Sequence, residues 1–137
     1  MRLETIDCKN FAPYGTVLEL TESSENPVFQ IPVEVPDSPW RIAILKILPR
    51  ELEQIECHPD SRESFEPVNG WTVLFAGSAP DVSALHAFVL DRPVCLYFGI
   101  WHGVVTLTQE SICKITENLK VPLVCEPLTQ PICIEAV

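Results

Sequence analysis

The segment from Glu56 to His58 carries two side chains that can bind a metal ion or move a proton. Successive side chains of a strand point to opposite faces, so an extended segment places Glu56 and His58 together and Cys57 opposite. Glu63 follows after a turn, and His102 lies far along the chain. Two carboxylates and two imidazoles are therefore expected to converge. Taken singly, the same residues also suit a solvated turn and a hydrogen-bonded core histidine.

Short apolar runs rich in Val, Ile, Phe, Trp and Tyr must position these residues, and their length and composition predict strands. The runs are residues 11–20, 40–48, 71–77, 85–90, 94–101, 104–108, 112–115 and 121–125. Thirteen prolines interrupt the chain and leave only 49–54 and 81–85 for short helical turns. Many short strands in one small chain predict an all-β sandwich or barrel.

Length and composition predict one folded domain, residues 1–137, because 47% of the residues are hydrophobic and only 20% are charged. A net charge of −10 without any basic cluster argues against nucleic acid as a partner. We expect no membrane span, because the longest uncharged stretch, 93–109, is interrupted by glycines. Without an apolar leader, the scattered cysteines are expected to be reduced thiols in the cytoplasm.

The predicted strands are too apolar for one face of each to be exposed to water. Most of them are therefore expected to face a packed interior or a subunit interface, which favours a homodimer. Prolines 122, 127 and 131 predict an extended edge segment near the C-terminus. This segment either closes the barrel or crosses to a partner.

Two spacings resemble the cupin motifs. His58, Glu63 and Gly70 match the histidine, glutamate and glycine of the first motif, and Gly99 with His102 matches the second. Metal-binding cupins begin the first motif with two histidines separated by one residue, and Glu56 stands in the first of those places. The resemblance implies a cupin-type double-stranded β-helix, or jelly-roll barrel.

The order of further residues resembles the ureidoglycolate lyase family, a branch of the cupins also called ureidoglycolate hydrolase. The matching elements run over nearly the whole chain. They are the segment FAPYG at 11–15, Glu56, His58, Pro59, Phe65, Pro67, Ala87, Phe88, Gly99, Trp101 and His102.

This resemblance implies a carbon–nitrogen lyase of purine or allantoin catabolism, which cleaves a small carboxylate, ureidoglycolate, to glyoxylate and urea. The step needs a base near the hydroxyl group, an acid near the departing nitrogen and positive charge for the carboxylate. The implied catalytic residues are Glu56, His58 and His102. A divalent metal held by these residues and Glu63 would lower the pKa of the hydroxyl group. Mixed imidazole and carboxylate ligands suit Zn, Mn, Fe or Ni, and lysis without a metal stays open.

The chain also departs from the family pattern. Arg62 and Glu63 replace a Ser-Gln pair, and Gly103 and Val104 replace a second histidine and its proline. Because Glu63 restores a cupin ligand, a metal cupin of other chemistry, an isomerase or oxygenase, is one alternative. The missing histidine makes a non-catalytic binding or regulatory module another.

Two residues are predicted to contact the substrate. Arg62 is the nearest cation that can pair with a carboxylate in a bidentate manner, although it equally suits a solvent-facing position. Trp101 is expected beside the substrate or as part of a packed wall.

Overall fold

The computed structural model describes residues 1–22 and 25–134, and the regular structure of these residues is almost entirely β. It consists of eleven strands and one turn of 3-10 helix, η1 (Val82–Ala84). The strands are β1 (Leu3–Thr5), β2 (Gly15–Val17), β3 (Trp40–Ile47), β4 (Glu51–Cys57), β5 (Glu63–Asn69), β6 (Thr72–Gly77), β7 (Leu85–Val89), β8 (Val94–Leu96), β9 (Trp101–Thr106), β10 (Ser111–Asn118) and β11 (Val124–Cys133).

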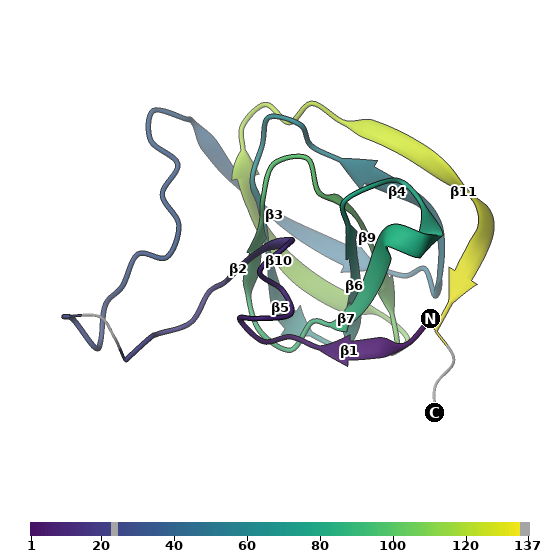
Figure 1. The fold of residues 1–137 in the computed structure, drawn as a ribbon, viewed down its shortest axis with the longest axis horizontal. Coiled ribbons are helices and arrows are strands. Elements are labelled where there is room, and N and C mark those ends of the chain that lie inside the picture. Colours follow the sequence, from purple (N-terminus) through teal and green to yellow (C-terminus); the bar gives the residue numbers. More distant parts are fainter. Residues whose placement is uncertain (23–24, 135–137) are drawn as a thin grey trace.

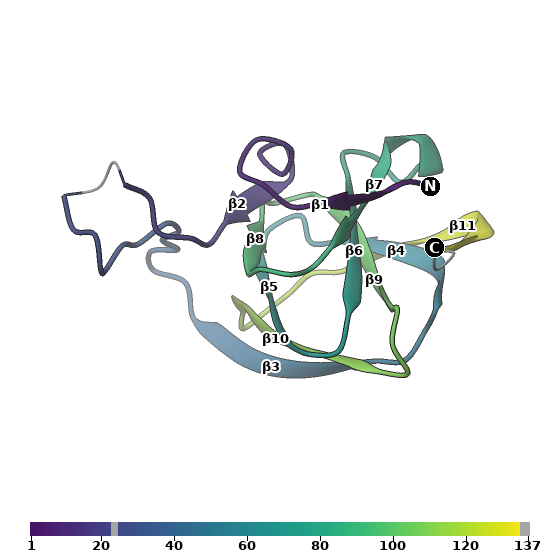
Figure 2. The ribbon, with the colours of Figure 1, turned by 90° about the horizontal axis from the view of Figure 1, so that it is seen from below.

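The strands form two sheets that enclose a barrel (Figure 1). Sheet A has six strands in the order β1-β7-β6-β9-β4-β11, and sheet B has five in the order β2-β8-β5-β10-β3. Figure 2 shows β3 and β10 along one side of the barrel and β1 and β7 along the other. From β3 to β10 the chain alternates between the sheets, except at the β6–β7 hairpin. This winding of eight strands is a jelly roll, the architecture of cupins, and it confirms the predicted all-β fold class.

Strand β6, in the interior of sheet A, is buried on both faces. Leu74 and Ala76 of β6 belong to the barrel interior together with residues of sheet B, whereas Val73 and Phe75 belong to a second core. That second core lies on the outer face of sheet A and includes Ile132 of β11. Burial on both faces explains why the run at 71–77 is continuously apolar instead of alternating.

The helical turn predicted at 49–54 is wrong, because residues 51–54 belong to strand β4. This strand pairs with β11 and buries Leu52 and Ile55 in the second core, and that tertiary pairing overrides the helix propensity of its Leu, Glu and Gln residues. The other predicted turn, at 81–85, is confirmed by η1. Its first backbone groups are capped by Asp81, whose Oδ1 accepts a hydrogen bond of 3.1 Å from Ser83 N.

The proline-rich segment near the C-terminus is an extended edge, as predicted. β11 lies at the edge of sheet A and pairs with β4 of the same chain, with a register shift between Pro127 and Ile132. Its apolar residues therefore close the second core.

The connection between β2 and β3, described for residues 18–22 and 25–39, extends away from the barrel on the left of Figure 1. It carries exposed apolar side chains, such as Val28 and Phe29, and leads into Trp40, Ile42 and Ile44 on the outer face of β3. In the described part of the chain, no helix has the length and hydropathy needed to span a bilayer.

Candidate metal centre

The register between β4 and β9 brings two of the predicted site residues together. Glu56 of β4 lies directly opposite His102 of β9, the one register position that pairs these strands. His58 follows the end of β4, and its carbonyl oxygen accepts a hydrogen bond of 3.0 Å from Gly99 N. Gly99 has a φ of 71°, which glycine adopts without the strain that a Cβ would add. This tight bend therefore ties the segment before β9 to the segment after β4.

Glu63 enters the site from the other sheet. It begins β5, where it lies opposite Leu96 and Glu117, and its side chain is buried within the barrel. The sequence also allowed a solvated turn at Glu63. In the structure this residue begins a strand, and its side chain faces inward.

The four side chains form a closed ring of short contacts. Oε2 of Glu63 lies 2.8 Å from Nε2 of His58 and 3.0 Å from Nε2 of His102. Oε1 of Glu56 lies 3.5 Å from Nε2 of His102 and 3.8 Å from Nε2 of His58. One ligand atom from each residue lies within 4.8 Å of all the others. Adjacent ligands that are bonded at about 2.1 Å to one ion lie about 3.0 to 3.4 Å apart. The contacts of Glu63 are close to this spacing, and those of Glu56 are wider.

Both imidazoles are held in the tautomer that a metal ligand needs. Nδ1 of His58 lies 3.2 Å from the Pro122 carbonyl oxygen, and Nδ1 of His102 lies 2.9 Å from that of Ile100. A carbonyl oxygen only accepts, so each Nδ1 carries a proton and donates it. The neutral ring then presents a lone pair at Nε2, toward the cluster.

Two atoms of the cluster are buried without a hydrogen bond from any described residue: Oε2 of Glu63 and Nε2 of His102. They lie at hydrogen-bonding distance from each other, but the N–H direction and the oxygen are not aligned. Buried polar atoms normally have a partner. Two buried ligand atoms that lie 3.0 Å apart without a hydrogen bond fit the coordination of a cation, so the residues present suit a divalent metal.

The charges of the metal-free cluster balance each other. Burial by itself raises the pKa of Glu63, but the imidazoles of His102 and His58 outweigh it and lower this pKa to about 2. Burial lowers the pKa of His102, whereas Glu56 and Glu63 outweigh burial and raise it to about 10. The pKa of His58 is also raised, because Glu63 outweighs both burial and the repulsion from His102. A metal ion that binds here takes the place of imidazole protons.

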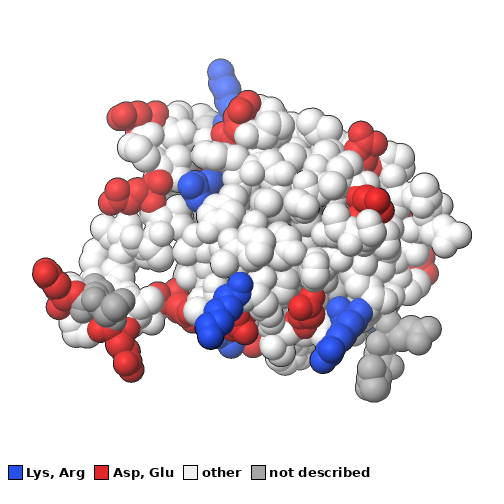
Figure 3. Space-filling model, in the orientation of Figure 1, with Lys and Arg blue, Asp and Glu red and all other residues white. Residues whose placement is uncertain are grey.

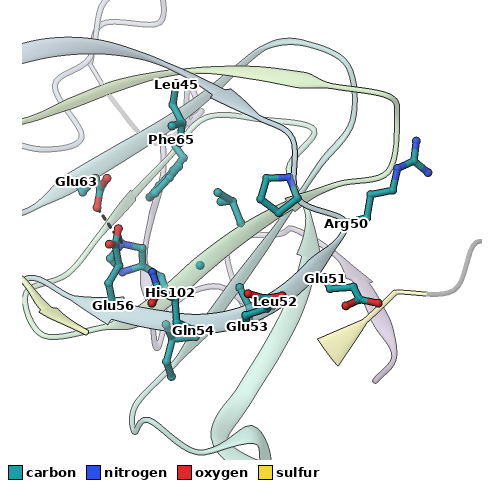
Figure 4. A pocket seen from close by; sticks show the side chains of 14 residues that line it. Leu45, Arg50, Glu51, Leu52, Glu53, Gln54, Glu56, Glu63, Phe65 and His102 are labelled. Atoms are coloured by element: carbon teal, nitrogen blue, oxygen red, sulfur yellow. Dashed lines mark ion pairs between the residues drawn. The ribbon is translucent and has the colours of Figure 1, made fainter. Parts of the chain in front are cut away.

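A cavity of about 650 Å³ leads to the cluster between β3, β4, β5 and β9. Figure 4 shows Glu56, Glu63 and His102 at one end, beside Phe65, and Arg50 at the other. The side chain of Glu56 is 39% exposed, whereas those of Glu63 and His102 are 6% and 2% exposed. Glu56 is therefore the member of the cluster that a bound molecule reaches first.

The structure brings Glu56, His58, Glu63 and His102 together but places the two predicted substrate-binding residues elsewhere. Trp101 packs against the second core, on the face of sheet A opposite His102. Arg62 lies over the Tyr97 and Phe98 rings and lines a different cavity.

Gly103 occupies the position where the ureidoglycolate lyase family has its second histidine. A Cβ at this position would lie 2.5 Å from Cδ1 of Leu52, in the second core. A side chain at 103 would therefore point away from the cluster, and the glycine at this position leaves the four candidate ligands intact.

Sequence reasoning also missed parts of the pocket wall. Gln54 and Val104 line the cavity beside the cluster. A correct prediction of strand β4, instead of a helical turn, would have placed Gln54 on the strand that carries Glu56.

No protein-family model and no curated protein matches the chain. Among solved structures, the chain is similar to oxalate decarboxylase from Bacillus subtilis, with a TM-score of 0.49 and 12% sequence identity over 66% of this chain. The chain spans 24% of the length of that decarboxylase, which contains Mn(II) centres. It is also similar to the dTDP sugar isomerase from Desulfovibrio desulfuricans G20, with a TM-score of 0.45 and 12% identity over 89% of this chain and 82% of that one.

The strand order and the position of the cluster define a jelly-roll barrel of the cupin type with a site that can hold a metal ion. Membership of the ureidoglycolate lyase family stays a prediction, because no family model matches.

The stability of the metal-free protein is expected to depend on pH through this cluster. Glu63 has its pKa lowered from 4.5 to about 2, so its contribution is complete above 4.5 and is lost as the pH falls toward 2. His102 has its pKa raised from 6.5 to about 10, so its contribution is complete below 6.5 and is lost as the pH rises toward 10. Urea unfolding in a chelating buffer should therefore show the greatest contribution between pH 4.5 and 6.5.

The matched control is Glu4→Gln, which removes the exposed ion pair of Glu4 with His86. This variant should keep the shape of the pH profile, whereas Glu63→Gln should flatten it. An unchanged profile in Glu63→Gln would show that the cluster does not govern it.

Metal binding is expected to require both histidines of the cluster. Loss of one ligand should weaken binding by more than about 100-fold, because changing groups that only orient ligands already costs 10- to 100-fold. Elemental analysis after dialysis against Mn²⁺ or Zn²⁺ should find metal in the wild type and little in His58→Ala or His102→Ala. His86→Ala, which changes the exposed histidine, is the control and should retain metal. Stoichiometric metal in either cluster variant would rule out this ligand set.

Proposed function

We propose that the chain is a metal-dependent cupin-type enzyme, with Glu56, His58, Glu63 and His102 as ligands of one divalent cation. The convergence of four ligand atoms within 4.8 Å carries this proposal. The proposed reaction is the carbon–nitrogen lysis of ureidoglycolate or a related small hydroxy acid in the cytoplasm. The sequence resemblance supports this reaction. The missing second histidine is no objection to it, because a side chain at position 103 would point away from the cluster.

A divalent cation in this site would supply Lewis acidity that lowers the pKa of the substrate hydroxyl group. His58, Glu63 and His102 are buried, and they would hold the cation in place. The side chain of Glu56 is 39% exposed at the cavity, so the carboxylate oxygen that would not bind the cation accepts the hydroxyl proton. The carbon–nitrogen bond then breaks as the carbonyl group of glyoxylate forms, and Glu56 returns the proton to the departing urea nitrogen.

A second candidate is an isomerase that acts on a neutral, hydroxyl-rich molecule. The charges that line the cavity favour it. Among the described residues that line the cavity, Arg50 is the one arginine or lysine. The lining carboxylates are those of Glu51, Glu53, Glu56 and Glu63. Two carboxylate ligands would neutralise a divalent ion, so the cavity would attract an anionic substrate only weakly. A neutral molecule could bind such a centre through its hydroxyl groups without electrostatic repulsion from the other carboxylates.

A turnover assay separates these candidates. Metal-loaded protein should release glyoxylate and urea from ureidoglycolate faster than the spontaneous reaction. Glu56→Gln should reduce the rate by about 100-fold or more, since it removes the proton-transferring group, while Glu4→Gln should leave the rate unchanged. Metal-loaded protein with no release above background would end the lyase proposal and leave the isomerase, to be tested on nucleotide-linked and free sugars.

We also propose that the chain forms a homodimer through the outer face of sheet B. Ile42 and Ile44 of β3 and Val68 of β5 are each more than half exposed there. Between these strands, Lys114 pairs with Glu66 at 3.0 Å, so the face is apolar and locally neutral. Such a face suits the same face of a second copy around a two-fold axis.

Light scattering should give twice the monomer mass for the wild type and the monomer mass for Ile44→Glu. Val28→Glu, at an exposed position of the β2–β3 connection, is the control and should remain dimeric. A monomeric wild type would contradict this proposal.

A further inference from the structure

A second cavity, of about 460 Å³, lies on the outer face of sheet B, where the β2–β3 connection meets the sheet. Its wall is largely apolar, with Leu18, Val33 and Val35 from the connection and Trp40 from the start of β3. Its size is within the range of about 300 to 1,000 Å³ that is usual for small-molecule sites. The connection projects from the barrel at the left of Figure 1, and Figure 3 shows acidic side chains on that projecting part.

Arg62 is the exceptional charge of this cavity. The two carboxylates in the wall already have cationic partners, because Glu66 pairs with Lys114 at 3.0 Å and Glu117 pairs with Arg41 at 2.6 Å. Arg62 has no carboxylate within ion-pair distance among residues 1–22 and 25–134. Its guanidinium carbon lies 5.7 Å and 5.0 Å from the centres of the Tyr97 and Phe98 rings.

The environment of Arg62 differs from that of the other cations without an ion pair in the described chain. Those residues are exposed and hydrated: Arg2, Lys9, Arg50 and Lys120. Arg62 is half-buried, and the rings hold its guanidinium by cation–π contact while its N–H groups keep their capacity to donate. A cation in this environment can bind an anion whose remaining surface is apolar.

We infer that this cavity binds a small organic carboxylate with an apolar body. The carboxylate accepts two hydrogen bonds from Arg62 in a bidentate manner, and the body lies against Trp40 and Val35. Ser38 adds a second polar group, since its Oγ accepts a hydrogen bond of 3.0 Å from Asn118 Nδ2 and keeps its own proton to donate.

This site is separate from the metal centre and from the apolar residues of the proposed dimer face, because Ile42, Ile44 and Val68 do not line the cavity. Arg62 and Glu63 are consecutive, and strand alternation sends the first to the outer face and the second into the barrel. An anion at Arg62 therefore leaves all four proposed metal ligands untouched. Binding here does not depend on the activity proposed above.

Calorimetry with 3-phenylpropionate tests the inference on metal-free protein in a chelating buffer, which prevents coordination of the probe to a metal. The wild type should bind the probe saturably, and Arg62→Gln should weaken binding at least tenfold. The neutral amide of the same acid should bind the wild type weakly. Arg2→Gln, which removes an exposed arginine, is the charge-matched control and should bind as the wild type does.

A second pair of variants leaves Arg62 in place. Val35→Glu places a carboxylate in the cavity wall and should abolish binding, whereas Val28→Glu, on the same connection outside the cavity wall, should not. Absence of saturable binding to the wild type, or equal binding to Arg62→Gln, would overturn the inference. It would also be overturned if the probe fails to bind and Arg62→Gln reduces the molecular mass, because a second copy would then occupy the cavity.

Discussion

The pairing of Glu56 with His102 across β4 and β9 is the constraint on which the site depends. A strand has a period of two, so a slip of one residue in this register would turn one of the two side chains to the opposite face. The strands on either side resist such a slip. β9 is paired over its whole length with β6, and β4 is paired with β11, which also closes the second core. The apolar packing of sheet A thus fixes the positions of Glu56 and His102, whereas Glu63 is positioned by the pairing of β5 in sheet B.

Electrostatics and packing oppose each other in this cluster. Burial disfavours charge on Glu63 and on both histidines, yet mutual attraction lowers the pKa of the Glu63 carboxyl group and raises the pKa of both imidazoles. The arrangement is tolerated because opposite charges lie within about 3 Å and each Nδ1 already has a backbone acceptor. Substituting one divalent cation for two protons preserves the charge of the cluster.

Much of the fold and the core of the site could be predicted from the sequence. Length and β-branched composition indicate the strands, and simple alternation places Glu56 and His58 on one face with Cys57 on the other. The convergence of Glu63 and His102 with these residues was predicted from the spacing of the motifs, because no local rule relates segments that lie far apart in the sequence. The same alternation also shows why Arg62 and Trp101 do not join the cluster, since each directly precedes one of its members. The helical turn at 49–54 was wrong because its strand pairing is with β11, a partner that local propensity cannot reveal.

At the start of β5, Arg62 and Glu63 carry opposite charges and lie on opposite faces of sheet B. Glu63 lies opposite Leu96 and Glu117, and this register sends its carboxylate inward and the preceding Arg62 outward. The opposite arrangement would place a guanidinium among the histidines, where it would repel a cation, and a carboxylate in the apolar cavity outside. Among residues 1–22 and 25–134 of this chain, whose net charge is −10, Arg62 has no carboxylate within ion-pair distance, because the register sends the Glu63 carboxylate to the other face. The proposed cation site inside the barrel and the proposed anion site outside it therefore both depend on one strand register.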